Sequence, residues 1–343
     1  MVNSLIIGFL LMIILVATIL IIMLTKTNQT KTINRNKPAL LRWNSEGVTV
    51  AGVNSTTGSA ANLLSSPYDL VVDWSYSLFV ADRANNRIQK FLRGSSNATT
   101  VAGRADGVAG STDTTLQEPT SLLVDDHGNI HVSDMANSRV MFWKKDAIQG
   151  TIAAGNQLYW PHGLQYDRQS NILFVSDFGY NRIMKYFYNN STGIRVAGNN
   201  SCGLSETQLC QPVGLFFDQS SNSLLIANYG KNNIVRWVLN DTQWSIVVGD
   251  SNGFAGNSPS LLRDPTDVML DPMGNIYVAD RFNHRVQFFL ADQLNATTIA
   301  GKTGMVGSNA TLLRNPNSIT FDNQLNLYVA DWHNHRIQKF SRY

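Results

Sequence analysis

The sequence predicts an all-β fold, a six-bladed β-propeller with four-stranded blades, and three observations lead to it. One phrase, VADRANNRIQKF at Val80–Phe91, returns almost unchanged at Val329–Phe340 and four more times in altered form. The acidic column of this phrase repeats at intervals of 52, 43, 51, 52 and 51 residues, and a proline precedes each member by fifteen or sixteen residues. Repeats of about this length that are rich in short strand segments are typical of propeller blades. The column consists of Asp82, Asp134, Asp177, Asn228, Asp280 and Asp331, and the prolines are Pro67, Pro119, Pro161, Pro212, Pro265 and Pro316.

Each repeat contains four strand signals in a fixed order. An apolar stretch follows the proline, as in PTDVMLD at Pro265–Asp271, and predicts the innermost strand. The segments IYVAD and RVQFF then flank a four-residue turn and predict a hairpin, because Val, Ile, Tyr and Phe favour strands. Fourth strands are expected at Thr99–Gly103, Thr151–Gly155, Ile194–Gly198, Ser245–Gly249 and Thr297–Gly301.

The two ends of the repeat region complement one another. Only three residues follow Phe340, so the sixth repeat lacks a fourth strand, while VTVAG at Val48–Gly52 precedes the first repeat without a blade of its own. We expect strand 48–52 to pair with the last blade and to close the ring, which removes the exposed strand edges of an open seam.

An apolar segment precedes the propeller. Leu5–Leu24 holds twenty residues without a charge, which is long enough for one transmembrane helix that acts as a signal anchor. The predicted organisation is an N-terminal tip at 1–4, the helix at 5–24, a polar stalk at 25–46 and the propeller at 47–343. A cleaved signal peptide is the alternative; the apolar run is longer than is usual for one, and no basic residue precedes it.

The sequence gives conflicting evidence about the side of the membrane on which the propeller lies. Lys26, Lys31, Arg35 and Lys37 follow the span, and by the positive-inside rule they place the propeller in the cytoplasm. Cys202 and Cys210, the only cysteines, share one short loop and predict a disulfide of an extracellular or lumenal domain; the alternative is two unpaired thiols in a reducing compartment.

Glycosylation sequons favour the same exported placement. The pattern Asn-x-Ser/Thr also occurs by chance in a chain so rich in these residues, yet two copies fall at equivalent turns of different blades, Asn97 and Asn295. We therefore expect a single-pass membrane protein with an extracellular or lumenal propeller. The candidate acceptors there are Asn54, Asn97, Asn189, Asn190, Asn199, Asn240, Asn295 and Asn309, and Asn28 lies in the stalk.

The charge balance argues against a nucleic-acid partner. The chain has 27 Lys and Arg and 24 Asp and Glu, of which five and one precede Gly47, so the propeller is nearly neutral. Nucleic-acid binders usually carry a concentrated basic surface.

The repeat grammar resembles the NHL-repeat family of six-bladed propellers, through the proline, the GNIYVAD strand pair and the D-x-x-N-x-R-[IV]-Q-x-F hairpin. The resemblance covers about 47–343 and implies the fold; the fourth repeat departs from it, with Asn228 and Asn233 in place of Asp and Arg. In the remaining repeats, Asp and Arg bracket a tight turn, and we interpret them as structural because five copies around a ring lack the asymmetry of an active site.

Family members also include peptide-amidating lyases, whose zinc histidines follow the blade proline. Only His162, in PHGL, occupies that position here, so His162 is a weak zinc candidate. Asp69 and Asp267 stand one residue further along and are weak calcium candidates, and their interpretation as turn acceptors is favoured over calcium ligation.

The turns between the Asp and Arg columns are expected around the mouth of the central channel. They are rich in aromatic residues and arginine, the residue types that dominate binding hot spots. The sequence favours a membrane-anchored recognition or scaffold propeller without a cofactor, which binds a protein, peptide or glycan partner on this face. The alternative is a metal-dependent lyase or hydrolase, with zinc or calcium, in the channel. The binding candidates are Phe178, Tyr180, Tyr229, Arg281, Phe282, Trp332 and His333.

Overall fold

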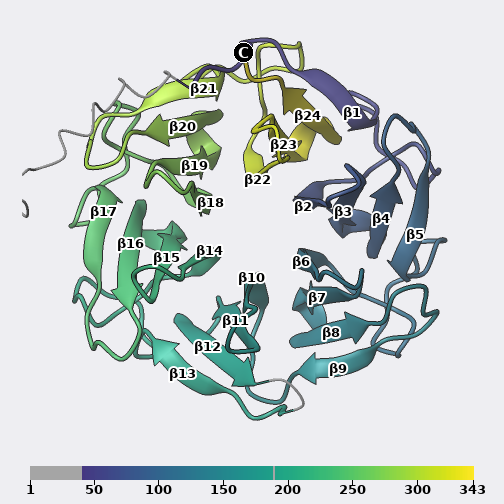
Figure 1. Cartoon of the computed structure of the whole chain (residues 1–343), viewed down its shortest axis with the longest axis horizontal. Coiled ribbons are helices and arrows are strands. Elements are labelled where there is room, and N and C mark those ends of the chain that lie inside the picture. The colour runs from purple at the N-terminus through teal and green to yellow at the C-terminus, as the bar shows by residue number, and fades with distance from the viewer. Residues whose placement is uncertain (1–40, 188–189) are drawn as a thin grey trace, which may run out of the picture. The chain divides into compact units, whose positions relative to one another are not determined.

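The computed structural model describes residues 41–187 and 190–343, and within them the chain forms six four-stranded antiparallel sheets arranged as blades around a central channel (Figure 1). Each of the first five blades is a meander of consecutive strands, innermost first. Blade 1 contains β2 (Pro67–Val72), β3 (Leu78–Asp82), β4 (Arg87–Phe91) and β5 (Ala98–Gly103). Blade 2 contains β6 (Pro119–Val124), β7 (Ile130–Asp134), β8 (Arg139–Trp143) and β9 (Thr151–Ala154). Blade 3 contains β10 (Pro161–Asp167), β11 (Ile172–Asp177), β12 (Arg182–Phe187) and β13 (Ile194–Ala197).

The second half of the ring repeats this plan. Blade 4 contains β14 (Pro212–Asp218), β15 (Ser223–Asn228), β16 (Asn233–Val238) and β17 (Ser245–Gly249). Blade 5 contains β18 (Pro265–Leu270), β19 (Ile276–Asp280), β20 (Arg285–Phe289) and β21 (Thr297–Gly301). Blade 6 contains β22 (Pro316–Phe321), β23 (Leu327–Asp331) and β24 (Arg336–Phe340). Single 3-10 turns join the second and third strands of five blades: η1 (Arg83–Asn85), η2 (Met135–Asn137), η3 (Tyr229–Lys231), η4 (Arg281–Asn283) and η5 (Trp332–Asn334).

The ring closes as the sequence predicts. Strand β1 (Val48–Gly52) pairs antiparallel with β24 and is the outer strand of blade 6, next to the chain's C-terminus in Figure 1. Its register joins Val48 to Lys339 and Gly52 to Arg336. The closure leaves blade 6 with four strands, so the ring has no incomplete blade at the seam.

The folded unit begins at Arg42, five residues before the expected start. Trp43, which falls within the predicted polar stalk, is buried, and its Nε1 donates to the Leu325 carbonyl oxygen at 2.8 Å. Its ring meets Tyr277 and Phe288 edge-on, with centroids 5.8 Å apart in both pairs. The expected membrane helix at 5–24 and the stalk up to residue 40 lie outside the described residues. No helix within 41–187 and 190–343 is long and apolar enough to cross a membrane.

The hydrophobic core lies between adjacent blades. One cluster joins Phe79 and Ile88 of blade 1 to Leu122 and Trp143 of blade 2, and equivalent clusters occur at other blade junctions. Because each sheet buries both faces against its neighbours, its middle strands are apolar throughout, as in β3, where all five residues are buried. The surfaces that remain accessible to a ligand are therefore the outer rim of the ring and the two ends of the channel.

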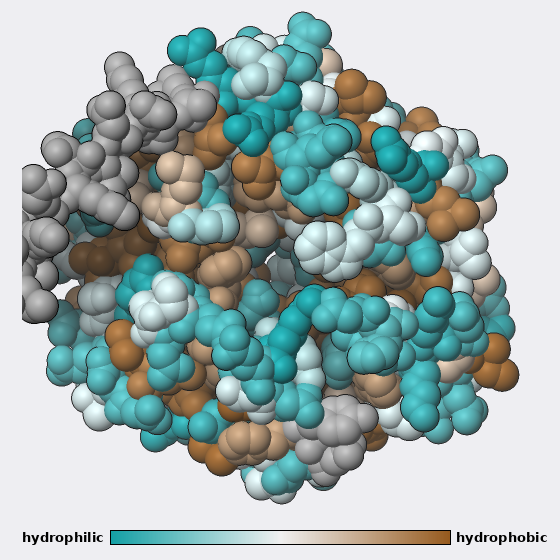
Figure 2. All heavy atoms as spheres, viewed as in Figure 1, coloured by the Kyte–Doolittle hydropathy of each residue, from teal (hydrophilic) through white to brown (hydrophobic). Residues whose placement is uncertain are grey.

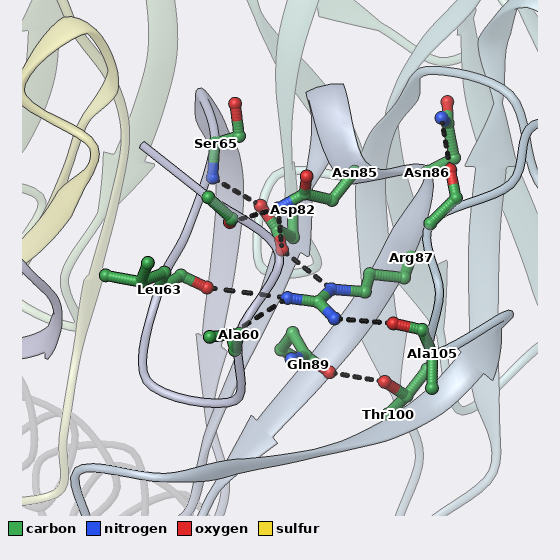
Figure 3. Close-up of polar contacts among 12 residues, drawn as sticks. Ala60, Leu63, Ser65, Asp82, Asn85, Asn86, Arg87, Gln89, Thr100 and Ala105 are labelled. Carbon is green, nitrogen blue, oxygen red and sulfur yellow. Dashed lines mark hydrogen bonds and ion pairs between the residues drawn. The ribbon is translucent and has the colours of Figure 1, made fainter. Parts of the chain in front are cut away.

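A buried hydrogen-bonded clamp fixes each turn at one end of the channel, and Figure 3 shows it in blade 1. The Asp82 carboxylate accepts the Ser65 N–H through Oδ1 at 2.7 Å and the Arg87 Nε–H through Oδ2 at 2.9 Å. Arg87 also donates Nη1 to the Ala105 carbonyl oxygen at 2.8 Å. Both charged side chains are almost fully buried, which satisfied partners make tolerable. This confirms that the Asp and Arg columns are structural; the pairs recur as Asp134–Arg139, Asp177–Arg182, Asp280–Arg285 and Asp331–Arg336.

Candidate binding site at the channel mouth

The first residue of each turn points its side chain around one mouth of the channel. The turn begins directly after the Asp of the clamp in five blades and after Asn228 in blade 4, so six equivalent positions place six side chains in a ring, which we call the mouth ring. Four of the seven binding candidates belong to it. A cavity of about 360 Å³ opens there, and the space-filling view shows a hollow at the centre of the propeller (Figure 2). The mouth ring consists of Arg83, Met135, Phe178, Tyr229, Arg281 and Trp332.

Aromatic side chains form a nearly continuous wall around this cavity. Tyr68 and His162, which follow the blade prolines, lie between the mouth-ring residues. Ring centroids are 6.0 Å apart for Trp332 and Tyr68 and 5.6 Å apart for Tyr68 and His162. They are 4.6 Å apart for His162 and Phe178 and 6.3 Å apart for Phe178 and Tyr229. Such a wall offers a large apolar contact area with little side-chain entropy to lose on binding.

Hydrogen-bond donors without acceptors face the same wall. The Arg281 guanidinium carbon lies 4.1 Å from the Trp332 ring centroid, and Arg281 Nε has no hydrogen-bond partner among the described residues. Arg83 Nε and Trp332 Nε1 lack partners in the same way, although Arg83 pairs with Glu118 at 2.5 Å. Buried polar groups in native proteins are normally satisfied, so the two arginines with an unpaired Nε at this cavity, Arg83 and Arg281, favour a ligand that brings acceptors.

His162 is a neutral part of the wall. It is buried, and burial, followed by the positive charges of Arg83 and Arg281, lowers its pKa to about 3. Its Nδ1 lies 3.3 Å from the Tyr68 hydroxyl. Across 41–187 and 190–343, no three His, Cys, Asp or Glu side chains are placed to hold one metal ion, so the weak zinc candidate has no set of co-ligands there.

Asp69 and Asp267 lie on the innermost strands β2 and β18, and the interpretation of these residues as turn acceptors is wrong. Asp69 accepts the N–H of Leu122 in the next blade at 3.0 Å, and Asp267 accepts that of Ile319 at 2.9 Å. Each carboxylate therefore joins neighbouring inner strands. These contacts form because the side chains of Asp69 and Asp267 lie beside the edge of the innermost strand in the following blade.

The two carboxylates share one hydroxyl. Ser318 Oγ lies 2.6 Å from Asp69 Oδ1 and 2.9 Å from Asp267 Oδ2, yet a hydroxyl has a single hydrogen to donate. The second contact therefore requires a proton on a carboxyl group. Burial raises the pKa of both groups, and burial together with the Asp69 charge raises that of Asp267 to about 7. No arginine or lysine forms an ion pair with either residue in the described chain.

The other three binding candidates lie beside the mouth ring. His333 stacks on Trp332 with centroids 4.0 Å apart and contacts Asn315 Oδ1, while Phe282 is exposed next to Arg281. Tyr180 is the third residue of its turn and contacts Tyr159 with centroids 5.5 Å apart. Tyr68, Tyr159 and Trp160 also belong to this site, although they are not among the residues predicted from the sequence. Tyr68 directly follows Pro67, and Tyr159 and Trp160 directly precede Pro161, so the signal for them lies in aromatic residues that flank the blade prolines.

The expected disulfide is present and the sequons are exposed. Cys202 and Cys210 are joined in the connection that precedes blade 4. Of the eight propeller sequons, Asn189 lies outside the described residues and the other seven are exposed. Asn97, Asn190, Asn240 and Asn295 lie between third and fourth strands, at the channel end opposite the mouth ring. Asn54, Asn199 and Asn309 lie in connections between blades, on the mouth side.

Comparison with known proteins supports the repeat assignment and the fold. The NHL-repeat family model matches residues 262–289 and 313–340, which contain the three inner strands of blades 5 and 6. Peptidyl-glycine alpha-amidating monooxygenase A of Xenopus laevis is 28% identical over 146 residues, or 41% of this chain and 15% of that protein. The chain thus spans about a seventh of the length of this curated relative.

Solved structures share the propeller at low identity. An auxiliary nutrient binding protein from Bacteroides thetaiotaomicron superposes with a TM-score of 0.66 at 15% identity, over 88% of this chain and 77% of that one. Virginiamycin B lyase from Staphylococcus aureus superposes with a TM-score of 0.55 at 12% identity, over 84% of this chain and 97% of that one. One fold thus carries binding proteins and a lyase, and these likenesses show the fold alone.

Proposed function

We propose that this protein is a membrane-anchored recognition propeller that binds a protein, peptide or glycan partner on its channel-mouth face. The supporting observation is the mouth ring itself, in which Phe178 and Tyr229 line a cavity together with Arg281, whose Nε has no partner among the described residues and whose guanidinium lies on the Trp332 ring. Rigid aromatic side chains and arginine in a concave site are the usual anchors of molecular recognition.

Substitution of the aromatic anchors tests this proposal. Trp332→Ala and Tyr229→Ala should each weaken partner binding by about 2 kcal/mol, or about thirtyfold, in a titration with the partner found by a binding screen. The thermal unfolding midpoint should change little, because both side chains are only partly buried. The matched controls are Asn97→Gln and Asn295→Gln at the opposite end of the channel, which should bind normally. The reverse pattern would move the site to the opposite face.

The proposed membrane placement has the propeller on the extracellular or lumenal side. The Cys202–Cys210 disulfide supports it, since disulfides persist mainly in oxidising compartments. Full-length protein from eukaryotic cells should lose apparent mass on glycosidase treatment, and both cysteines should resist alkylation without a reductant. An unchanged mass together with freely alkylated cysteines would place the propeller on the cytoplasmic side.

A second candidate is a metal-dependent lyase or hydrolase in the channel. It rests on the position of His162 after a blade proline and on the partial likeness to the amidating monooxygenase. Zinc or calcium in a one-to-one ratio with the purified protein, with an activity that is lost on chelation, would favour this candidate over recognition alone.

A further inference from the structure

The mouth site extends sideways over blade 3, where the connection from the preceding blade is unusually short. Before the other blades, thirteen to fifteen residues separate the last strand's glycine from the proline, but only five separate Gly155 from Pro161. In most blades the long connection folds over the turn and is bound by an asparagine, as Asn85 Nδ2 donates to the Gly58 carbonyl oxygen at 2.8 Å. The equivalent residue in blade 3 is Tyr180, which has no such connection above it.

Three aromatic side chains fill this gap and face solvent. Tyr159, Trp160 and Tyr180, which we call the aromatic platform, are 41%, 42% and 45% exposed. Tyr159 and Trp160 stack at 4.7 Å with planes 22° apart, and a β-carbon at Gly179 would collide with the Tyr159 ring. The glycine therefore lets the platform lie flat on the turn. Contiguous exposed apolar side chains at the edge of a cavity are typical of binding surfaces.

Trp160 connects the platform to the mouth ring. Trp160 lines the same cavity as Phe178, Tyr229 and Arg281, so a ligand seated against Arg281 reaches the platform without a gap. The opposite side of the mouth is rich in arginine: Arg263, Arg281 and Arg314 form no ion pair with any residue in the described ranges. Glu118 is already paired with Arg83, and Asp264 is the remaining nearby acid. Charge complementarity thus favours an anionic group at Arg281.

An extended peptide fits the inner strands poorly. Peptides that add to a sheet need free N–H and C=O groups along a strand edge. At the inner edges facing the channel, the N–H groups of Leu122, Leu164 and Ile319 already donate to Asp69, Ser121 and Asp267. What the site offers instead is flat aromatic surface next to cationic donors. That combination suits a sugar ring, whose C–H face packs on the electron-rich face of an aromatic ring.

We propose that this site takes an acidic oligosaccharide, with a sugar carboxylate at Arg281 and a neighbouring sugar ring on the aromatic platform. The inference rests on the proposed recognition function and names its ligand class. A carboxylate paired with the guanidinium supplies the acceptors that the mouth-ring donors lack. The platform adds sequence-independent stacking for the next sugar, which makes the site selective for chains over free acids.

The test is calorimetric titration of the full-length, deglycosylated protein with defined probes. These are 3′-sialyllactose and tetragalacturonate, neutral lactose, and tetraglutamate as an acidic peptide. At least one acidic oligosaccharide should bind about tenfold or more tightly than lactose. Arg281→Gln should abolish that preference, and Tyr180→Ala should weaken the binding of the acidic oligosaccharide severalfold.

Trp74→Ala is the matched control, because Trp74 is 76% exposed and lies between β2 and β3, away from the mouth. It should bind like the wild type, and all variants should keep the wild-type unfolding midpoint. Failure of both acidic oligosaccharides to bind, or unchanged affinity in Arg281→Gln, overturns the inference. If a peptide or protein binds instead and Trp332→Ala abolishes that binding, the recognition function stands and only the ligand class is wrong. If no ligand of any class responds to Trp332→Ala or Tyr229→Ala, both are wrong.

Discussion

Blades 4 and 6 hold the connections above their turns by different chemistry. In blade 6 the Arg336 guanidinium binds the Asp331 carboxylate and donates to the carbonyl oxygens of Ser308 and Asn309 at 2.8 and 2.9 Å. Blade 4 has Asn228 and Asn233 at the equivalent positions, joined by a 3.1 Å hydrogen bond, and no guanidinium of the described residues reaches its connection.

The disulfide takes the place of the missing guanidinium. Cys202 and Cys210 close the connection before blade 4, and the Cys210 N–H donates to Asn228 Oδ1 at 2.7 Å, as Ser65 does to Asp82 in blade 1. We infer that each blade requires a restrained connection above its turn and that a charge pair is only one way to restrain it. A buried ion pair restrains the native state, whereas a covalent link limits the freedom of the unfolded chain.

The largest expected effect comes from breaking the charged clamp. Arg336→Ala leaves the Asp331 carboxylate buried without its cation and should lower the free energy of unfolding by about 3–5 kcal/mol. Urea unfolding at neutral pH measures it. The control is Arg168→Ala, which removes an exposed pair with Asp126 and should cost less than about 1 kcal/mol. Equal losses in the two variants would show that the clamp is no stronger than a surface pair.

Reduction of the disulfide should cause the next largest loss of unfolding free energy. A chain that lacks one of the two cysteines should not respond to the reductant. For the short loop between Cys202 and Cys210, loss of the cross-link should cost about 2–3 kcal/mol, measured as the difference in urea unfolding with and without a reductant. Cys202→Ser should show that lower stability without reductant and no further change with it. A wild type that is insensitive to reductant would mean that blade 4 is held by its asparagines alone.

Asp267 differs from the Asp residues of the clamps, because it is buried without a cationic partner among the described residues. Its pKa is raised to about 7, so the folded chain keeps a proton that the unfolded chain loses above its ordinary pKa of 3.8. Stability from this proton is fully present below that ordinary pKa and is lost as the pH rises to about 7, by up to about 1.4 kcal/mol per pH unit. Asp267→Asn should remove this part of the pH dependence in unfolding measurements between pH 4 and 8. Parallel profiles of the variant and wild type would show that the carboxyl group is ionised throughout.

Most of the fold could be predicted because its restraints are local and repeated. The Asp and Arg of each clamp are five residues apart, as Asp82 and Arg87 are. The same carboxylate accepts the backbone N–H of the residue two positions before the blade proline, which is Ser65 in blade 1. Such contacts recur at a constant spacing in sequence, so the period, the strands and the closing strand 48–52 all follow from it. The disulfide followed from the isolation of two cysteines in one loop.

The membership of the site was only partly predictable. Phe178, Tyr229, Arg281 and Trp332 were found because each begins a turn of the repeated phrase. Tyr68 and Trp160 were missed as binding residues because they sit next to the prolines, where the repeats differ most and where neither residue type has a chemical signature of its own.

The sequence alone is enough to predict the blade number, the strand order, the clamps and the way the ring closes, because each depends on contacts within one repeat or on the constant spacing between repeats. Which side chains of different blades come into contact depends on the tertiary structure. Arg281 stacks on Trp332, His162 lies against Phe178, and Ser318 stands between Asp69 and Asp267. Of these three contacts, the first and last join residues of different blades, and their distances are set by how closely the inner strands pack around the channel. That packing depends on the whole closed ring, which no single repeat encodes.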